Sequence, residues 1–438
     1  MKIQLSDHFT YEKLLRFTLP SIAMMIFTSI YGVVDGFFVS NFAGDIPFKA
    51  VNLTWPFLMI MSTVGFMFGT GGTAIVAYTL GQGDHERANS YFSLFVYVTA
   101  GLGVVFGVLS FIFIRPIVSL LGATGEILEN CVVYGRIVLC ALPFIVMQYL
   151  FQSFLVAAEK PHLGLVVTVA AGVTNMVLDA VLVMALPQEH KLAGAAIATA
   201  LSQVVGGGVP LVYFARKNSS TLRLGRTRYD SRALLKACTN GSSEFMSNVS
   251  MSLVGMLYNL QLIKYAGDDG IAAYGVMMYV SMIFSAVFIG YSIGSAPVIS
   301  YHHGARNYGE LHGLLRRSLV LISASAVVMF AAALARIFVS YSAPLLDMTV
   351  HGFRIFSLAF LFMGFAIFSS SFFTALNDGL TSALISFLRT LVFQTGAVLL
   401  LPLALGLDGI WYSVVAAELM AVVFSSIFLI AKRKKYHY

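Results

Sequence analysis

Four acidic residues interrupt long apolar stretches of this 438-residue sequence. Asp35, Asp179, Glu244 and Glu418 lie inside such stretches, whereas the other acids fall between stretches or at their ends. An ionised side chain at the centre of a bilayer costs at least roughly 2.5 to 3.5 kcal/mol, so such acids usually face a protein interior or a water path. These four residues are therefore the first candidates for binding or moving a cation.

Asp35 and Asp179 are expected to reach the same depth. Each precedes the end of its stretch by about seven residues, or roughly 10 Å at 1.5 Å per residue, and Thr199 follows the start of its stretch by a similar length. Asn175 precedes Asp179 by one helical turn, so both side chains project from one face. Two carboxylates, an amide oxygen and a hydroxyl could bind Na+ or hold a shared proton, and the chemistry leaves both ions open.

Interhelical hydrogen bonding is the competing interpretation of these polar residues, because it is a common packing device in membranes. It is stronger for Asn175 and Thr199 than for the two aspartates, since amides and hydroxyls are tolerated between helices. Glu244 follows the polar run CTNGSS and is compatible with an aqueous edge. We therefore treat Glu244 and Glu418 as secondary intramembrane acids.

The composition predicts an all-α polytopic membrane protein. The chain is 58% hydrophobic and 11% charged, with a mean hydropathy of +0.84, whereas soluble domains carry roughly 25% charged residues. A spanning helix needs roughly 20 apolar residues, and the first stretch is too long, and lacks the cleavage pattern, for a signal peptide. We expect twelve spans, near residues 14–42, 50–80, 90–114, 130–158, 162–186, 192–216, 234–266, 270–302, 312–340, 350–376, 380–405 and 408–431.

An internal repeat divides the chain into two lobes. Shifting the sequence by 223 positions gives 13 identities over 62 positions, including Ala43-Gly44-Asp45 on Ala266-Gly267-Asp268. A shift of 218 aligns Arg136-Ile137 with Arg354-Ile355. Six spans per repeat is an even number, so the two repeats are expected to be parallel, with substrate between them. The predicted domains are an amino-terminal lobe (1–217), a basic cytoplasmic linker (218–232) and a carboxy-terminal lobe (233–438).

The distribution of basic residues predicts that both termini are cytoplasmic. With twelve spans, that arrangement places 20 of the 27 Lys and Arg residues on the cytoplasmic side and 7 on the other, as the positive-inside rule requires. The formal charge of +7 is therefore explained by membrane orientation, and no nucleic-acid partner is expected.

Two motifs suggest other chemistry and are discounted. Gly290-Tyr-Ser-Ile-Gly294 matches the GxSxG pattern of hydrolases, but that pattern needs a strand-to-helix turn. His302-His303 offers only two adjacent ligands, fewer than a structural zinc site needs. The three cysteines have no CxxC spacing. We expect no enzyme activity, no catalytic residue, no cofactor and no metal site, apart from the coupling site if its ion is Na+.

The polar constellation resembles the amino-lobe cation site of multidrug and toxic compound extrusion (MATE) transporters. The resemblance lies in Asp35, in the NxxxD pair Asn175 and Asp179, and in Thr199 within GAAIATALSQ. Pro20, fifteen residues before Asp35, matches the family's bending proline in the first helix. The segments GQGDHERA and SYHHGARNYGEL resemble its paired loops. A branch of the family has an acid in the tenth span, where this chain has only Ser369, Ser370 and Ser371.

The resemblance implies a V-shaped pair of six-helix bundles that alternates access and exports amphipathic or cationic compounds in exchange for H+ or Na+. It implies a monomer in the plasma membrane, with a small-molecule substrate and surrounding lipid as partners. The first alternative is a flippase for a lipid-linked saccharide, which would need a basic lumen for pyrophosphate, and Arg389 is the main interior basic residue. An intramembrane enzyme or receptor is the remaining alternative.

Overall fold

The computed structural model describes residues 3–334 and 343–438, and this part of the chain is built of helices joined by short connections. The first set of elements is α1 (Tyr11–Phe38), η1 (Val39–Ala43), α2 (Asp45–Gly81), α3 (His85–Leu120), α4 (Gly125–Cys140), α5 (Leu142–Ala157), α6 (Pro161–Ala185), η2 (Gln188–His190) and α7 (Lys191–Ala215). The second set is α8 (Ser231–Gly304), α9 (Tyr308–Leu334), α10 (Ala343–Phe356), η3 (Ser357–Ala359), α11 (Phe360–Ala375), α12 (Gly379–Phe387), η4 (Leu388–Phe393), α13 (Gln394–Leu405) and α14 (Leu407–Tyr436). The end of the expected ninth span, with Arg336, lies outside the described residues.

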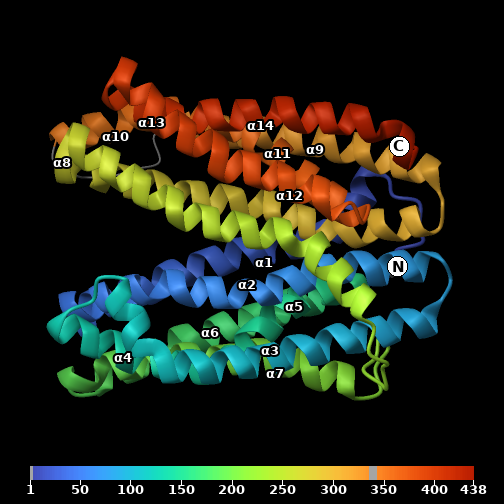
Figure 1. Ribbon diagram of the computed structural model, residues 1–438, viewed down its shortest axis with the longest axis horizontal. Coiled ribbons are helices and arrows are strands. Elements are labelled where there is room, and N and C mark those ends of the chain that lie inside the picture. The colour runs from blue at the N-terminus through green and yellow to red at the C-terminus, as the bar shows by residue number, and fades with distance from the viewer. Residues whose placement is uncertain (1–2, 335–342) are drawn as a thin grey trace.

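The helices form two bundles that lie side by side. Figure 1 shows α1 to α7 in one bundle and α8 to α14 in the other, with both termini at the same end of the molecule. The segment between α7 and α8 runs over that end without regular structure. The all-α class of the protein is therefore confirmed, and the bundles meet mainly along α2 and α8.

Within the described residues, ten helices are long and apolar enough to cross a membrane, and the pair α4 and α5 gives an eleventh if it counts as one bent span. The expected seventh and eighth spans are joined in α8, where Gly267 breaks the helical backbone with a φ of 61°. Glycine tolerates this left-handed φ because it lacks a Cβ. The first part of α8 is the remaining expected span, and its Ser and Asn residues make it less apolar than the others, so twelve spans agree approximately with the structure.

The fourth expected span is bent by 57° between α4 and α5. Pro143 lies in the first turn of α5. Proline has no backbone N–H and excludes the preceding residues from a continuous helix. The backbone at Ala141 leaves the helical region accordingly, with φ −93° and ψ 0°.

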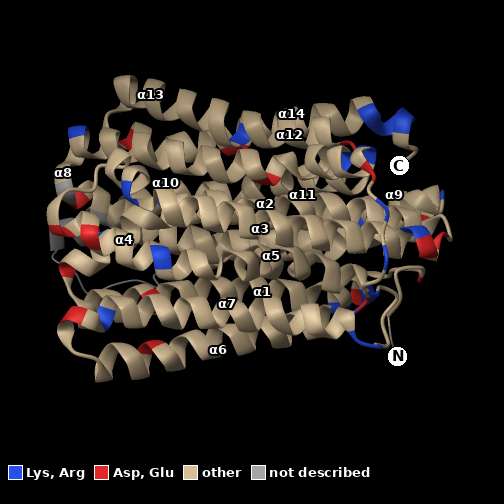
Figure 2. Ribbon diagram, turned by 60° about the horizontal axis from the view of Figure 1, so that its bottom comes forward, with Lys and Arg blue, Asp and Glu red and all other residues tan. Residues whose placement is uncertain are grey.

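The surface has the polarity of an integral membrane protein. Large apolar side chains are exposed along the helices, for example Val108, Ile112, Val177 and Leu400. Figure 2 shows charged residues gathered at the two ends of the bundles and few of them between. A lipid environment explains exposed apolar side chains on this scale.

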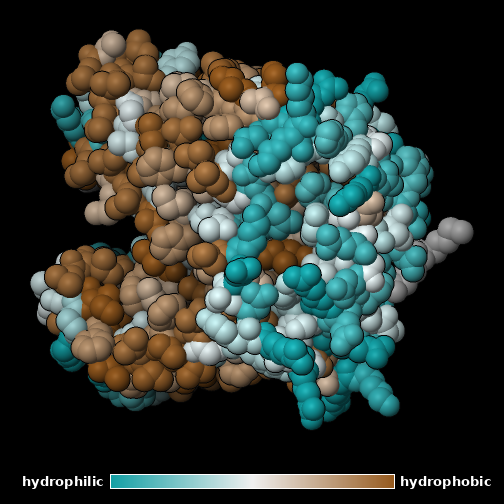
Figure 3. Space-filling model, turned by 45° about the vertical axis from the view of Figure 1, so that its right-hand side comes forward, coloured by the Kyte–Doolittle hydropathy of each residue, from teal (hydrophilic) through white to brown (hydrophobic). Residues whose placement is uncertain are grey.

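The two bundles separate at one end and close at the other. Figure 3 shows a notch between them at the end away from the termini, and a hydrophilic surface at the terminal end. The amino-terminal segment bridges the closed end, because Leu5 N–H donates to Glu159 Oε1 (3.0 Å) of the first bundle. Phe9 N–H donates to Glu310 Oε1 (2.9 Å) of the second bundle. The segment therefore ties the two bundles together at this end.

Glycines related by the sequence repeat bring α2 and α8 into backbone contact at the closed end. A Cβ on Gly81 would collide with the carbonyl of Tyr301, and a Cβ on Gly304 would collide with the carbonyl of Tyr78. The 223-position shift pairs Tyr78 with Tyr301 and Gly81 with Gly304. Each copy of the repeated motif thus packs on the other copy, as expected for two parallel repeats around one axis.

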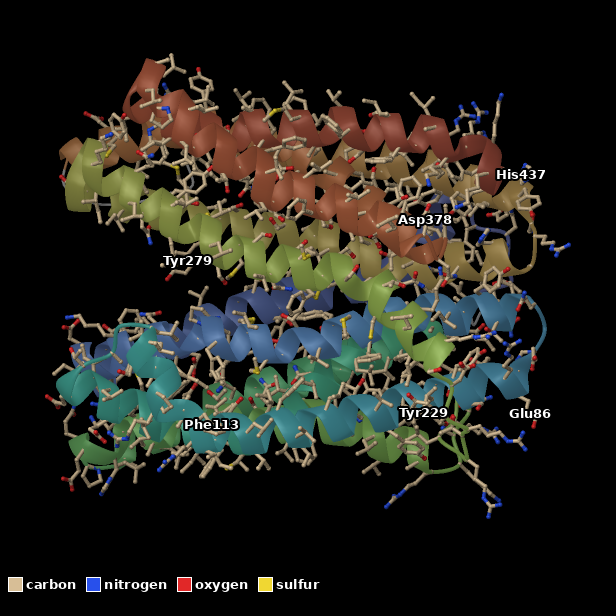
Figure 4. The ribbon with its side chains drawn as sticks, in the orientation of Figure 1. Glu86, Phe113, Tyr229, Tyr279, Asp378 and His437 are labelled. Carbon is tan, nitrogen blue, oxygen red and sulfur yellow. The ribbon has the colours of Figure 1, made fainter. Side chains whose placement is uncertain are left out.

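The carboxy terminus folds back on this end through Asp378, which precedes α12. Tyr436 Oη donates to Asp378 Oδ2 (2.8 Å), and Asp378 caps α12 by accepting a hydrogen bond from Thr381 N–H at Oδ1 (3.3 Å). Burial alone would raise the pKa of Asp378, but the hydrogen bonds from Tyr436 and Thr381 and the charge of Lys432 outweigh it and lower the pKa. Figure 4 shows Asp378, His437 and Glu86 toward this end of the molecule, with Tyr279 away from it on α8.

Candidate functional site

The structure brings Asp35, Asn175 and Asp179 together inside the amino-terminal bundle. Asp35 lies near the end of α1, and the other two lie one turn apart on α6. Asp35 interacts with both Asp179 and Asn175. Asp179 is completely buried and Asn175 is 2% exposed. The i, i+4 spacing that predicted a shared face for Asn175 and Asp179 therefore corresponds to one cluster with Asp35.

Three of the four carboxylate oxygens of this cluster lack a hydrogen-bond donor among the described residues. Both oxygens of Asp179 and Oδ1 of Asp35 are buried without a partner among the described residues. The two negative charges repel each other, and ionised carboxylates carry acceptors only, so they cannot bond each other. A proton shared between them, or a bound cation with oxygen preference, would supply the missing partner and offset the repulsion.

Thr199 lies close to this cluster, and the residue that connects the two was not predicted from the sequence. Tyr134, on α4, interacts with Thr199 and lies within electrostatic range of Asp35 and Asp179. The Thr199 and Tyr134 hydroxyls are buried without a hydrogen bond to any described residue. A polar aromatic residue inside an apolar span was the available signal, but tyrosines also occur at membrane surfaces, so the signal is weak.

A second group of polar side chains lies beside α1. Tyr31 interacts with Gln148 of α5 and Gln203 of α7. The side-chain oxygens of both glutamines are buried without a donor. The two glutamine oxygens are therefore hydrogen-bond acceptors inside the amino-terminal bundle, and a cationic group or a water molecule could donate to them.

Pro20 lies buried within α1, and the helix continues through it from Tyr11 to Phe38. The nearest irregularity to Asp35 is the π-helical turn η1, which begins at Val39. π-Helical turns within α-helices are frequent at functional sites. The bending role of Pro20 stays a prediction.

Glu418 belongs to a different site, in the carboxy-terminal bundle. Arg389 of η4 donates to it through Nε (3.0 Å to Oε1 and 2.9 Å to Oε2) and through Nη2 (2.7 Å to Oε1). The Glu418 side chain is 1% exposed and that of Arg389 is 16% exposed. Glu418 is thus neutralised by an ion pair, unlike the amino-lobe acids.

Glu244 lines the same cavity as this ion pair. The cavity is about 260 Å³ in volume, close to the lower end of the ~300–1,000 Å³ range of small-molecule sites. Its wall comes mostly from α8, α11, η4 and α14, with Phe66 and Ser153 from the amino-terminal bundle. Ser370 and Ser371 also line it, so the tenth span contributes hydroxyls where a family branch has an acid. Glu244, Glu418 and the amino-lobe acids therefore form two separate polar sites.

The GxSxG motif and the His302-His303 pair both lie in α8, and their surroundings account for them without catalysis or metal binding. Ser292 is in the helix interior, away from the strand-to-helix turn that a hydrolase nucleophile needs. Gly290 and Gly294 lie against the backbone of α1, so they permit close helix approach. His302 and His303 belong to no group of three or more potential metal ligands in the part of the chain that the structure describes.

Comparison with known proteins identifies the family. The MatE family model matches residues 20–181 and 245–397, which is more than half of the chain. The multidrug export protein MepA of Staphylococcus saprophyticus is 24% identical over 418 residues, covering 93% of this chain and 91% of its own. MepA of Staphylococcus haemolyticus is 26% identical over 322 residues, covering 73% of this chain and 70% of its own.

Solved structures share the fold over almost the whole chain. An outward-facing conformation of a multidrug resistance MATE family transporter superposes with a TM-score of 0.92 and 22% identity, over 98% of this chain and 97% of that one. A MATE in the straight conformation superposes with a TM-score of 0.89 and 21% identity, over 98% and 97% of the two chains. The family model, the relatives and the fold agree, and the chain belongs to the MatE family of membrane transporters.

Proposed function

We propose that the protein is a secondary antiporter that exports amphipathic or cationic compounds in exchange for H+ or Na+. The relatives named as multidrug export proteins support the export of several compounds. The apolar cavity wall, with a small number of polar groups, suits amphipathic small molecules. We propose a monomer in the plasma membrane with both termini in the cytoplasm.

The observation that carries the coupling proposal is the buried pair of acids in the amino-terminal bundle, three of whose four carboxylate oxygens have no hydrogen-bond donor among the described residues. Asp35 and Asp179 interact with each other, and both oxygens of Asp179 and Oδ1 of Asp35 have no hydrogen-bond donor among the described residues. A buried carboxylate pair of this kind is costly unless it exchanges a proton or a cation. We therefore assign cation coupling to Asp35, Asn175, Asp179 and Thr199, with Tyr134 beside them.

The notch between the bundles supports an alternating-access cycle. It opens away from the termini, so with cytoplasmic termini this conformation faces outward. The glycine contacts between α2 and α8 close the opposite end. In the inward-facing conformation we expect these contacts to separate and the notch to close.

A lipid-linked saccharide flippase is less compatible with the charges of the carboxy-lobe cavity. The described lining contains Glu244 and Glu418 but only one basic residue, Arg389, and Arg389 is already paired. A pyrophosphate group would meet a net negative wall, which opposes its binding. Export of drug-like amphiphiles therefore remains the favoured proposal.

Purified protein in vesicles loaded with ethidium tests this proposal. We expect ethidium efflux to accelerate when an inward H+ or Na+ gradient is imposed, one gradient at a time, because an antiporter couples the two movements. The ion that drives efflux identifies the coupling ion. Vesicles without protein are the control, and efflux that ignores both gradients would contradict antiport.

A further inference from the structure

The segment that joins the two bundles carries a dense positive charge. Residues 216–232 contain six basic side chains and one acid, Asp230. Asp230 caps α8 by accepting a hydrogen bond from Ala233 N–H at Oδ1 (3.0 Å). The six basic residues are all exposed, and none has an ion-pair partner among the described residues: Arg216, Lys217, Arg223, Arg226, Arg228 and Arg232. The positive charge of this segment is therefore free to attract an external anion.

Neutral groups hold the segment on the first turns of α3. Arg223 N–H donates to Asn89 Oδ1 (2.7 Å), and Gly225 N–H donates to Ser93 Oγ (3.0 Å). Leu222 is completely buried and packs in the core of the amino-terminal bundle. Because backbone groups and neutral side chains make these contacts, the guanidinium groups stay free. A partner would meet a segment that is already ordered, so binding costs little conformational entropy.

The length of α3 places this segment at the level of lipid headgroups. The helix has 36 residues, or roughly 54 Å at 1.5 Å per residue, whereas the hydrocarbon core of a bilayer is about 30 Å thick. With the excess shared between its ends, roughly the first 12 Å of α3 lies outside the hydrocarbon, which includes Asn89 and reaches Ser93. Figure 1 shows α3 and α7 on the side of their bundle that is away from the other bundle. The segment on α3 therefore borders the surrounding lipid.

An apolar stripe continues along α3 from the segment. Tyr97 Oη donates to Gly225 O (3.1 Å), and the Tyr97 side chain is 48% exposed. Val104, Val108 and Ile112 are also exposed and follow Tyr97 at intervals of seven, four and four residues, which places them on one helical face. A lipid whose headgroup lay at the segment would have its acyl chains along this stripe.

The residue types favour a phosphate group. Five of the six basic residues are arginines, and a guanidinium group can donate two parallel hydrogen bonds to a phosphate. Tyr229 is 79% exposed beside them, and Figure 4 shows it at the terminal end of the amino-terminal bundle. Tyrosine is enriched at the headgroup level of membranes, and basic clusters beside spanning helices attract anionic lipids.

The basic carboxy-terminal tail differs from this segment because its charges are engaged. Lys432 Nζ and Lys435 Nζ lie 3.4 Å and 3.9 Å from Asp378 Oδ2. Arg433 Nε donates to Tyr438 O (3.1 Å). Basic residues at the terminal end are therefore not equivalent, and the joining segment has the larger unpaired group.

We propose that residues 223–228 bind the headgroup of an anionic phospholipid, with its phosphate at Arg223, Arg226 and Arg228. The acyl chains lie along the exposed stripe of α3 that begins at Tyr97. With cytoplasmic termini, this lipid belongs to the inner leaflet. The proposal requires a membrane protein but not the proposed antiport, so ethidium efflux tests the antiport separately.

Native mass spectrometry of the purified full-length protein tests this site with two lipids that have the same acyl chains. Phosphatidylglycerol is anionic and phosphatidylcholine is zwitterionic, so the wild-type protein should bind the first more tightly. In Arg223→Gln/Arg226→Gln/Arg228→Gln, phosphatidylglycerol affinity should fall at least about tenfold, because each basic residue near an anionic lipid contributes several-fold. Phosphatidylcholine affinity should stay within about twofold of wild type, since that lipid has no net charge.

Arg306→Gln/Arg316→Gln/Lys434→Gln is the matched control. It removes the same charge from three exposed residues of the other bundle that have no ion pair among the described residues. Phosphatidylglycerol affinity should stay within about twofold of wild type, because the site on α3 is intact. An equal loss in this control would show that only the total charge matters and would overturn the site.

Replacing the three arginines by lysine keeps the proposal testable if the glutamine variant does not fold. This variant should bind phosphatidylglycerol at least about twofold more weakly than wild type, because lysine keeps the charge but lacks the paired donors. Unchanged affinity in whichever arginine variant folds, or equal losses for the two lipids, would overturn the proposal.

Two competitors distinguish the lipid from other sources of phosphate. Neither inorganic phosphate nor a single-stranded oligonucleotide at the lipid concentration should displace phosphatidylglycerol, because neither has acyl chains for the stripe on α3. Displacement by inorganic phosphate would assign the arginines to a free anion. Displacement by the oligonucleotide would assign them to a nucleic acid, and either result would overturn the lipid site.

Discussion

Asp179→Asn is expected to reduce gradient-driven efflux to the rate of vesicles without protein. Asp179 is fully buried, and neither of its oxygens has a donor among the described residues. Asparagine has nearly the same size, but it can neither carry the coupling charge nor release a proton. The variant should therefore fold, because it removes a buried charge and its repulsion from Asp35. Ethidium efflux under an imposed gradient, at matched protein content, is the measurement.

Asp35→Asn is expected to behave in the same way, since the two acids share one cluster. Glu86→Gln is the matched control, because Glu86 is an exposed acid of the same bundle at the closed end. It should retain wild-type efflux. Normal gradient dependence in both aspartate variants would remove the coupling role of the cluster.

The second large effect is expected from Gly81→Val combined with Gly304→Val. Each added side chain would collide with a backbone carbonyl of the other bundle, and overpacking typically costs about 1–3 kcal/mol per site. Two such clashes should depopulate the closed terminal end by at least about tenfold. Efflux should fall accordingly, because the outward-facing conformation of the proposed cycle requires this closure.

A distance measurement distinguishes this mechanism from general damage. Spin labels at Glu86→Cys and Lys435→Cys, exposed sites on opposite bundles, should move apart in the double valine variant. The three native cysteines are first replaced. Gly101→Val is the control, because a Cβ there meets nothing within 4 Å. If the control variant lengthens the distance as much as the double variant does, the α2 and α8 contact is not the closure point.

The amino-lobe cluster could be predicted from sequence because membrane burial makes each charged residue informative. Asp35 and Asp179 stood out against apolar surroundings, and the one-turn spacing placed Asn175 beside Asp179. Tyr134 could not be identified in this way, because a tyrosine costs much less to bury than an acid. Its position beside Thr199 depends on how α4 bends away from α5.

The carboxy-lobe site was harder to predict because its residues come together only in the folded bundle. Arg389 and Glu418 are 29 positions apart on different helices, and no helical spacing relates them. The sequence singled out all three charged residues of the cavity, but not that Glu418 is paired and Glu244 is free of partners among the described residues. The repeat, in contrast, was visible in the sequence, and its glycines form the contact between the bundles.

The helix count was predicted approximately, and the exceptions have local causes. Gly267 replaces a longer loop between the expected seventh and eighth spans by a break at a single residue within α8, and Pro143 accompanies the bend that divides the fourth. Hydropathy reports the length of an apolar stretch, but it does not report the backbone angles at a single residue. The π-helical turns η1 and η4 could not be predicted from the sequence for the same reason.

The most direct test of the account is whether a drug gradient alone moves the coupling ion. Vesicles loaded with ethidium and placed in drug-free buffer, with no ion gradient imposed, should take up H+ or Na+ as ethidium leaves, because antiport obliges opposite movement. Asp179→Asn should abolish this uptake. Ethidium release from wild-type protein without any movement of either ion would contradict the account.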